Sequence, residues 1–192
     1  MSELWDAEAA SFDQEADHGL TDPVVRAAWR DLLVGVLPPV PARVADLGCG
    51  TGTLSRLLTD EGYDVTGLDF SPEMIRRARE KVPEAEFVVG DAARPPLARS
   101  AYDVVLSRHV LWAMPDPAAA FERWCTLLRP GGLAILVEGS WSTGAGLTAA
   151  ESLEIVEAAG WVGTVRPLTE AAYWGKQITD ERYLLIAAKP GM

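Results

Sequence analysis

The sequence contains no asparagine, three lysines, two histidines and two cysteines among its 192 residues. Nucleic-acid binding depends largely on Lys and Arg side chains that neutralise phosphates. Here 28 acidic residues outnumber 17 basic ones, and the net charge is −11. This balance argues against DNA, RNA and anionic membranes as partners, and it is compatible with a neutral or cationic small molecule.

Cysteine and apolar residues are also distributed in ways that exclude some classes. Cys49 and Cys125 are too few for a disulfide framework and lack zinc-ligand spacing, which indicates a reducing compartment. The acidic N-terminus does not resemble a secretory signal. The apolar stretches, such as Leu133–Val137, fall far short of the ~18 residues that cross a membrane. We therefore expect a cytoplasmic location, and the excess of Arg over Lys is typical of a GC-rich bacterial genome.

The order of the predicted elements indicates an α/β protein. The strand candidates alternate with helices, which favours a parallel sheet covered on both faces. No helix fits between the last two strands, so we expect those two to be antiparallel. We predict an N-terminal helical arm or lid over 1–38 and a core over 39–192. The strand candidates are 43–47, 64–69, 86–90, 102–107, 133–138, 161–168 and 182–189.

Several helix boundaries carry clear signals. Starts are predicted at Asp22-Pro23, at Ser71-Pro72 and at Thr148, which forms a capping box with Glu151. A further helix is predicted over 117–129, ended by the Pro-Gly-Gly of 130–132.

The central feature is a glycine-rich turn after the first predicted strand. The segment 44–52 reads VADLGCGTG, in which glycines let a ligand approach the backbone and a helix N-terminus follows. The alternative is a tight turn without a ligand. The spacing is Gly48-x-Gly50-x-Gly52, and Thr53 stands where a dinucleotide fingerprint requires its third glycine. That departure disfavours NAD and NADP.

Two acids close the next two predicted strands. Asp69 ends the second strand, 17 residues after Gly52, where a carboxylate can accept hydrogen bonds from ribose hydroxyls. Asp91 ends the third strand and is followed by Ala92. An acid there can accept a hydrogen bond from the exocyclic amine of adenine, with apolar neighbours against the ring.

Five segments in this order resemble the motifs of class I S-adenosylmethionine-dependent methyltransferases, and most closely the small type 11 methyltransferase domain. The resemblance covers about residues 40–140. It implies a Rossmann-like three-layer sandwich whose seven-stranded sheet is mostly parallel with an antiparallel last strand, and S-adenosyl-L-methionine as cofactor. The segments are Asp46–Gly52, Gly67–Pro72, Gly90–Ala92, Asp103–Ser107 and Leu128–Leu133.

The resemblance also implies roles for single residues. The methionine end of the cofactor would be held by Asp46 and the turn Gly48-Cys49-Gly50, and the ribose by Asp69. Phe70 and Met74 would flank the adenine, Asp91 and Ala92 would recognise its amine and edge, the backbone of Ser107 would lie near the sulfonium, and Phe12 would belong to a lid over the cofactor.

The histidines are candidates for proton transfer. His109 follows the fourth predicted strand, and its near-neutral pKa suits a base that takes a proton from a hydroxyl or amine. The alternative is a histidine that hydrogen-bonds backbone at a helix start. His18 lies with Phe12 in the acidic arm, where a role in a lid competes with a solvated arm.

Other residues are candidates for the acceptor side. Arg108 could bind a carboxylate of the acceptor or of the cofactor, or a surface acid. Trp112, Trp141, Tyr173 and Trp174 are predicted in loops, where they could line an apolar or aromatic acceptor pocket or serve ordinary packing. No metal site is predicted, because the two histidines lie far apart without ligand-like spacing.

The sequence thus predicts methyl transfer from S-adenosylmethionine to a small-molecule acceptor, through oxygen or nitrogen rather than carbon. No Asn/Asp-Pro-Pro-aromatic motif follows the fourth strand, so the resemblance does not point to DNA bases or glutamine as acceptors. The alternative is a protein of the same fold that acts as a cyclase or as a non-catalytic binding module. The oligomeric state stays open.

Overall fold

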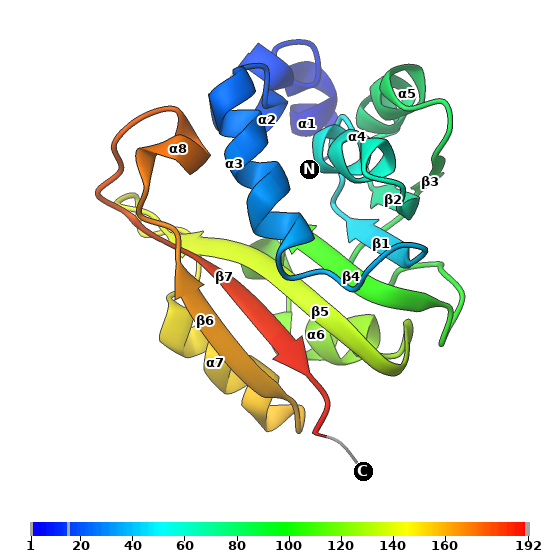
Figure 1. Ribbon diagram of the computed structural model, residues 1–192, viewed down its shortest axis with the longest axis vertical. Helices are drawn as coiled ribbons and strands as arrows, with labels where there is room; N and C mark the ends of the chain where they lie inside the picture. Colours follow the sequence, from blue (N-terminus) through cyan, green and yellow to red (C-terminus); the bar gives the residue numbers. More distant parts are fainter. Residues whose placement is uncertain (1, 15, 191–192) are drawn as a thin grey trace.

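The computed structural model describes residues 2–14 and 16–190, which form a seven-stranded sheet with helices on both faces (Figure 1). The strand order is β3-β2-β1-β4-β5-β7-β6. The predicted fold class is confirmed. The strands are β1 Arg43–Leu47, β2 Asp64–Asp69, β3 Glu86–Val89, β4 Tyr102–Arg108, β5 Leu128–Ser140, β6 Val162–Pro167 and β7 Glu181–Ala188.

Strand directions follow the expectation from the sequence. β1 pairs in parallel with β2 and β4, and β4 pairs in parallel with β5. β7 is antiparallel to both β5 and β6. The chain reverses its direction of travel across the sheet between β1 and β4, and in open α/β sheets the crevice for ligands opens at the carboxyl ends of such strands.

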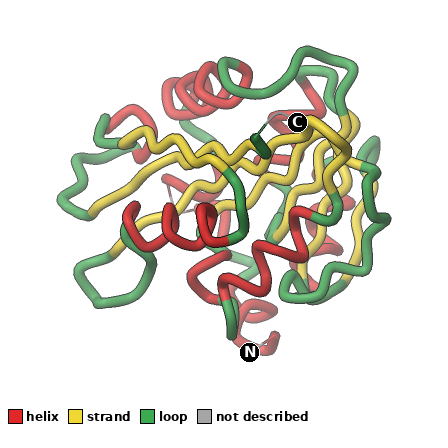
Figure 2. The backbone as a smooth tube through the Cα atoms, turned by 90° about the horizontal axis from the view of Figure 1, so that it is seen from below, coloured by secondary structure: helices red, strands yellow, loops and turns green. Residues whose placement is uncertain are grey.

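The helices divide between the two faces of the sheet, which is the twisted central layer in Figure 2. α3, α4 and α5 lie on one side and α6 and α7 on the other (Figure 1). The long helices are α3 Pro23–Val34, α4 Thr53–Asp60, α5 Pro72–Lys81, α6 Pro117–Cys125 and α7 Ala149–Ala158. The short ones are α1 Ser2–Glu8, η1 Phe12–Gln14, α2 Ala16–Gly19, η2 Leu111–Ala113 and α8 Ala171–Trp174.

Side-chain caps explain where the long helices begin. The Asp22 carboxylate accepts the N–H of Val24 at 2.7 Å, and the Ser71 hydroxyl accepts the N–H of Met74 at 3.1 Å. Each satisfies one of the backbone donors that a helix start leaves unpaired. The helix starts predicted at Asp22, Ser71 and Thr148 are confirmed.

The core consists of one apolar layer on each face of the sheet. Successive strand residues alternate between the layers, so that Val104 and Leu106 face α3 and α4 while Val105 faces α6 and α7. On the first face Trp29 of α3 is fully buried, and its Nε1 donates to the carbonyl of Tyr173 at 2.7 Å. α3 therefore packs with the core layer, although it falls within the predicted arm 1–38, and that domain boundary stays a prediction.

The structure corrects several sequence-based predictions about elements. The helix predicted over 117–129 ends at Cys125, because the Thr126 hydroxyl donates to the carbonyl of Arg123 and the chain then turns into the sheet. β5 begins at Leu128 and includes the Pro-Gly-Gly segment, with a register shift against β4. A helix, α8, does fit between β6 and β7, so Tyr173 and Trp174 lie in a helix rather than a loop. Trp112, also predicted in a loop, lies in the short helix η2.

The capping box of α7 provides a test of the fold that leaves the crevice untouched. Thr148 accepts the N–H of Glu151 at 3.2 Å, and Glu151 accepts the N–H of Thr148 at 2.8 Å. Thr148→Ala should lower the free energy of unfolding by about 1 kcal/mol, which is a fall in Tm of roughly 2–4 °C for a chain of this size. Thermal unfolding measures the change. Thr148→Ser is the control and should recover most of the loss, and an unchanged Tm in the alanine variant would contradict this account.

Candidate functional site

A pocket lies at the carboxyl ends of β1, β2 and β4, where the topology places the crevice. It gathers residues from the turns after β1, β2, β3 and β4 and from the N-terminal segment. The lining residues are Trp5, Phe12, His18, Asp46, Gly48, Cys49, Gly50, Leu54, Asp69, Phe70, Met74, Asp91, Ala92, Arg108, His109, Val110, Ala113 and Met114.

The glycine turn after β1 is held by the end of β2. The carbonyl of Leu68 accepts the N–H groups of Gly48 and Cys49 at 2.7 and 2.9 Å. Oδ2 of Asp69 accepts the next N–H, that of Gly50, at 3.0 Å. Gly48 has φ +71°, and a Cβ there would collide with the side chain of Val110. Glycine is therefore required at 48 both by the backbone conformation and by the close approach of Val110.

Two buried carboxylates face the pocket from this region. Asp69 also accepts the N–H of Ser71 at 2.9 Å, and burial raises its pKa while these N–H groups oppose the rise. Asp46 accepts the Ser55 hydroxyl at 2.6 Å, and burial raises its pKa to about 6. Because an opposite charge stabilises a carboxylate in such surroundings, the pair favours a ligand that carries a cationic group there.

The turn after β3 is supported from behind. Oδ1 of Asp91 accepts the N–H of Ala93 at 2.8 Å, which fixes the turn after β3. The carbonyl of Ala92 accepts Nε1 of the buried Trp124 from α6 at 2.7 Å. The Asp91-Ala92 pair is thus held in place by contacts that leave its side chains at the pocket.

A second turn, after β4, is held by the end of β5. The N–H of His109 donates to the carbonyl of Val137 at 2.8 Å. Oε1 of Glu138 accepts the next two N–H groups, those of Val110 and Leu111, at 3.0 and 2.7 Å. Glu138 is fully buried, and burial raises its pKa to about 8. Sequence reasoning missed Glu138, although an acid that ends the apolar run 133–137 was a usable signal.

His109 lies between the pocket and a group of tryptophans. Its ring packs edge-on against Trp141, with centroids 5.2 Å apart, and lies 6.0 Å from Trp174. Trp112 packs against Trp141 and donates Nε1 to the carbonyl of His109 at 3.0 Å. Trp174 is fully buried and donates Nε1 to the carbonyl of Leu168. These three tryptophans therefore support His109 from behind and do not line the pocket.

Arg108 and Ser107 occupy different positions at the end of β4. Arg108 lines the pocket, lies 5.3 Å from the ring of Trp29 and donates to the carbonyl of His18 at 3.4 Å. Its charge also opposes the rise in the pKa of Asp46. Ser107 is fully buried and its side chain lies outside the pocket lining.

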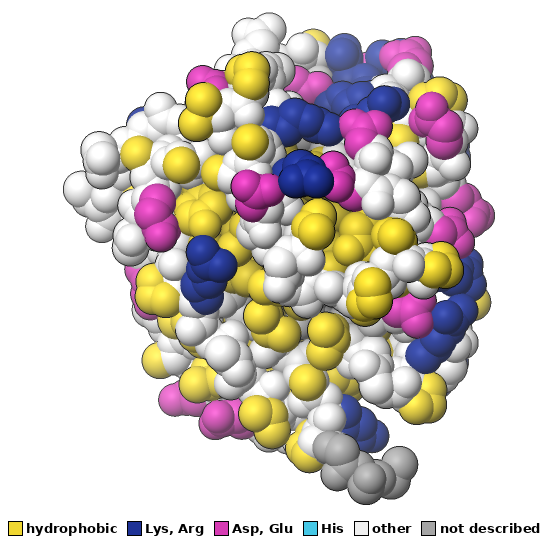
Figure 3. Space-filling model, in the orientation of Figure 1, with side chains coloured by type: hydrophobic (Ala, Val, Ile, Leu, Met, Phe, Trp, Pro, Cys, Tyr) yellow, Lys and Arg dark blue, Asp and Glu magenta, His cyan; other side chains and the backbone are white. Residues whose placement is uncertain are grey.

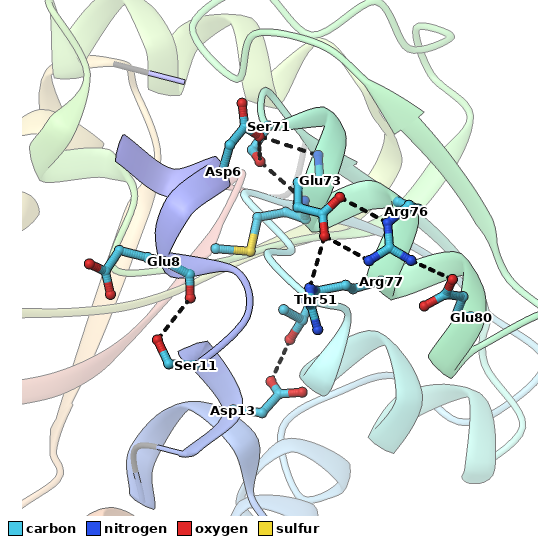
Figure 4. Close-up of polar contacts among 11 residues, drawn as sticks. Asp6, Glu8, Ser11, Asp13, Thr51, Ser71, Glu73, Arg76, Arg77 and Glu80 are labelled. Atoms are coloured by element: carbon cyan, nitrogen blue, oxygen red, sulfur yellow. Dashed lines mark hydrogen bonds and ion pairs between the residues drawn. The ribbon is translucent and has the colours of Figure 1, made fainter. Parts of the chain in front are cut away.

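The N-terminal segment closes one side of the pocket through acidic side chains (Figure 4). Asp6 accepts the Ser71 hydroxyl at the start of α5, and the N–H of Glu73 at 3.3 Å. Asp13 accepts the hydroxyl of Thr51 and pairs with Lys81 at 2.6 Å. Burial tends to raise the pKa of Asp13, but the Lys81 and Thr51 hydrogen bonds outweigh it, and the pKa is lowered.

Aromatic rings of the same segment cover the glycine turn. The rings of Phe12 and His18 stack with centroids 4.3 Å apart. Phe12 lies so close to Gly50 that a Cβ at that position would come within 3.3 Å of its ring. The structure thus brings most of the predicted site residues together in one pocket. Sequence reasoning missed five of its lining residues, which carry no charge or motif, namely Trp5, Leu54, Val110, Ala113 and Met114.

Charge elsewhere is dispersed. On the face drawn in Figure 3, basic side chains lie beside acidic ones. Surface ion pairs include Arg26–Asp60 and Arg30–Glu61. Within residues 2–14 and 16–190, no cluster of three His, Cys, Asp or Glu side chains could hold a metal ion. None of the helices in the described part of the chain is long and apolar enough to cross a membrane.

Fold and pocket together define a Rossmann-like protein with a nucleotide-type site. Residues 45–136 match the family described as methyltransferase domain. The chain is 34% identical over 144 residues to a demethylmenaquinone methyltransferase of Renibacterium salmoninarum, which covers 72% of this chain and 61% of that protein. It is 38% identical over 120 residues to a 2-methyl-6-phytyl-1,4-hydroquinone methyltransferase of Synechocystis, covering 60% of this chain and 36% of that protein.

A solved structure with a different activity in its name shares the fold. The crystal structure of the cyclase SpnF superposes with a TM-score of 0.74 at 21% identity and covers 86% of this chain and 82% of that one. Residues 45–136 thus match a methyltransferase domain, and the chain is similar to S-adenosylmethionine-dependent methyltransferases of class I. It spans about three fifths of the length of the first of these curated relatives.

The residues present fit the cofactor of this family, S-adenosyl-L-methionine. The cofactor carries a sulfonium and an amino group, a ribose diol and an adenine. The pocket offers the carboxylates of Asp46, Asp69 and Asp91 at three successive strand ends, and the apolar side chains of Phe70 and Met74 beside them. These carboxylates suit the cationic amino group of the cofactor and the hydrogen-bond donors of its ribose and adenine.

The raised pKa of Glu138 predicts how the free energy of unfolding depends on pH. The unfolded chain releases this proton near the ordinary value of 4.5, whereas the folded chain holds it to about pH 8. The folded form therefore binds more protons in this window, and stability falls as pH rises through it. The free energy of unfolding of the wild type, minus that of Glu138→Gln, should become smaller from pH 5.5 to pH 8, by at most about 1.4 kcal/mol per pH unit. Urea unfolding at the two pH values measures this difference.

The glutamine variant is itself the control, since all other titrating groups are common to both proteins. A difference that stays constant between the two pH values would show that Glu138 ionises at the same pH in both states.

Proposed function

We propose that this protein transfers a methyl group from S-adenosylmethionine to a small-molecule acceptor bound beside His109. The observation that carries the proposal is the arrangement of the pocket. The carboxylates of Asp46, Asp69 and Asp91 and the side chain of His109 line the same cavity, so a methyl donor and an acceptor can share it.

On the cofactor side, we assign contacts from the position of each group. The turn Gly48–Gly50 and Asp46 hold the methionine end, Asp69 the ribose and Asp91 the adenine amine, with Cys49 as a small residue of the turn. Phe70, Met74 and Ala92 enclose the adenine. Bound here, the cofactor supplies a methyl group made electrophilic by the sulfonium, and the protein has to align the acceptor and exclude water.

On the acceptor side, apolar side chains line the pocket beside His109 and Arg108. Val110, Ala113 and Met114 belong to the segment after β4 and surround the position of His109. This lining fits an acceptor with an apolar or aromatic body. A neutral imidazole can accept the proton of a hydroxyl or amine as the methyl group arrives, so methylation at oxygen or nitrogen is proposed ahead of carbon.

The names of the relatives support an aromatic acceptor. One of them acts on demethylmenaquinone and another on a hydroquinone, by their names. The second candidate function is a cyclase of the same fold, which the likeness to SpnF favours. The free thiols of Cys49 and Cys125 fit a reducing compartment, and a cytoplasmic location is part of the proposal.

The N-terminal segment is proposed as a lid. The cavity has a volume of about 200 Å³ with Phe12 over the glycine turn, which is below the ~300 Å³ at which small-molecule sites begin. A ligand of nucleoside size therefore requires the segment to move. Its attachment through the Asp6 and Asp13 carboxylates to hydroxyl and ammonium groups, rather than through apolar packing alone, is compatible with such opening.

Binding of S-adenosylhomocysteine, the expected product, tests the cofactor assignment. At about 100 times Kd it should stabilise the protein by ~2.7 kcal/mol, a rise in Tm of roughly 5–10 °C, while NAD should give none. Asp69→Ala should abolish the rise because it removes the ribose acceptor and the support of Gly50. Asp64→Ala, at the exposed start of the same strand, is the matched control and should keep it. A full rise in Asp69→Ala would contradict the assignment.

Turnover with candidate acceptors tests His109. With a panel of phenols, hydroquinones and amines, His109→Ala should slow methyl transfer about 100-fold or more, with affinity for S-adenosylhomocysteine changed only a few-fold. His18→Gln is the comparison, because a lid residue should alter cofactor affinity more than the rate of transfer. Near wild-type transfer by His109→Ala would reject a base at this position, and turnover of an acceptor without methylation would favour the cyclase.

A further inference from the structure

The turn after β4 repeats the construction of the glycine turn after β1. In each, the residue directly after the strand has positive φ, +71° at Gly48 and +60° at His109. In each, three consecutive N–H groups are bound by the neighbouring strand. In each turn the first N–H donates to a backbone carbonyl at the end of the neighbouring strand. The last N–H donates to the side-chain carboxyl of the residue that follows that carbonyl. Glu138 therefore has the same position relative to the turn at His109 as Asp69 has relative to the turn at Gly48.

The two turns differ at the residue with positive φ. Glycine adopts this conformation readily, whereas a residue with a Cβ pays a strain energy and keeps it only where its surroundings enforce it. His109 is such a residue, and its N–H and the two that follow are all bound by Val137 and Glu138. These three hydrogen bonds stabilise the strained backbone conformation of His109.

Nothing else about Glu138 accounts for a buried carboxyl group at this position. It does not line the pocket, and its Oε2 has no hydrogen-bond partner among the described residues. Tyr183 faces it across β7, but the Tyr183 hydroxyl bonds Ser152 and the carbonyls of Leu147 and Thr148. Burying an acid that is only half satisfied costs free energy, so its hydrogen bonds to the turn are the reason to look for a function.

We propose that Glu138 is a positioning residue that sets the direction of the His109 ring by holding the amides of Val110 and Leu111. The inference deepens the proposed function, because it concerns the group assigned to accept the proton. Glu138 also positions the glycine turn indirectly, because the side chain of Val110 contacts Gly48 and so connects the two turns.

The test uses the fact that the chain has two histidines, His18 and His109, whose imidazole signals in NMR spectra can be assigned with His18→Gln. Glu138→Met keeps the volume of the side chain and removes the acceptor. It should shift the His109 imidazole signals, leave those of His18 unchanged, and speed amide hydrogen exchange at 109–111 at least tenfold. Glu138→Gln keeps an oxygen acceptor and should restore the wild-type signals and exchange rates.

Tyr183→Phe is the matched control, since it removes a buried polar group from the facing strand without touching the turn. It should lower Tm without moving the His109 signals. The proposal is overturned if Glu138→Met lowers Tm as Tyr183→Phe does and leaves the His109 signals and the exchange at 109–111 unchanged. It is also overturned if Glu138→Gln disturbs both as much as Glu138→Met.

A shorter acid covers the case in which Glu138→Met does not fold. Glu138→Asp keeps the carboxyl group but cannot reach both amides, so it should shift the His109 signals in the same direction and speed exchange at 110 and 111. Unchanged signals in that variant would overturn the proposal. Binding of S-adenosylhomocysteine is measured separately on each variant, so a failure of the cofactor assignment is distinguished from a failure of this inference.

Discussion

The pocket depends on hydrogen bonds between each turn that forms it and the end of the strand beside that turn. Parallel strands end together at one edge of the sheet, so the backbone acceptors at the end of one strand lie beside the donors of the next turn. In this way Leu68 and Asp69 accept the N–H groups of the turn after β1, and Val137 and Glu138 accept those of the turn after β4. The site is therefore built from backbone groups, and the carboxylates complete it.

This construction explains why the site contains buried acids in a chain of already high negative charge. A backbone carbonyl can accept two N–H groups, but a turn that leaves a strand presents three in succession. A carboxylate on the following residue supplies the missing acceptor, and burial raises its pKa as a consequence. Asp69 has the additional function of facing the ligand. Glu138 does not line the pocket, so no bound ligand would lower its raised pKa.

The sequence predicted the cofactor side of the site better than the acceptor side. The glycine turn and the acids that end β2 and β3 follow from local spacing, because each lies at a strand end whose partners are adjacent in the sheet. Glu138 binds the amide of Val110, about 30 positions away, and Val110 packs against Gly48, about 60 positions away. No local sequence pattern identifies the distant partner in such contacts. The fold was predictable from the alternation of elements. The end of α6 was not, because the buried Leu127 and Leu128 extend its apolar periodicity past the true boundary.

The contact between Gly48 and Val110 makes the two turns one structural unit. The glycine turn can vary little, since a side chain at 48 would displace Val110 and with it the segment that carries His109. The residues after His109 are under a weaker constraint, because the amides of Val110 and Leu111 need only stay bound to Glu138, while the side chains of Val110, Ala113 and Met114 line the pocket. Change of acceptor, and even change of reaction on this fold, is therefore expected to arise in the segment 109–114 and in the N-terminal segment opposite it. The likeness of the fold to that of a cyclase is consistent with this division, since a shared fold leaves the chemistry to the parts that vary.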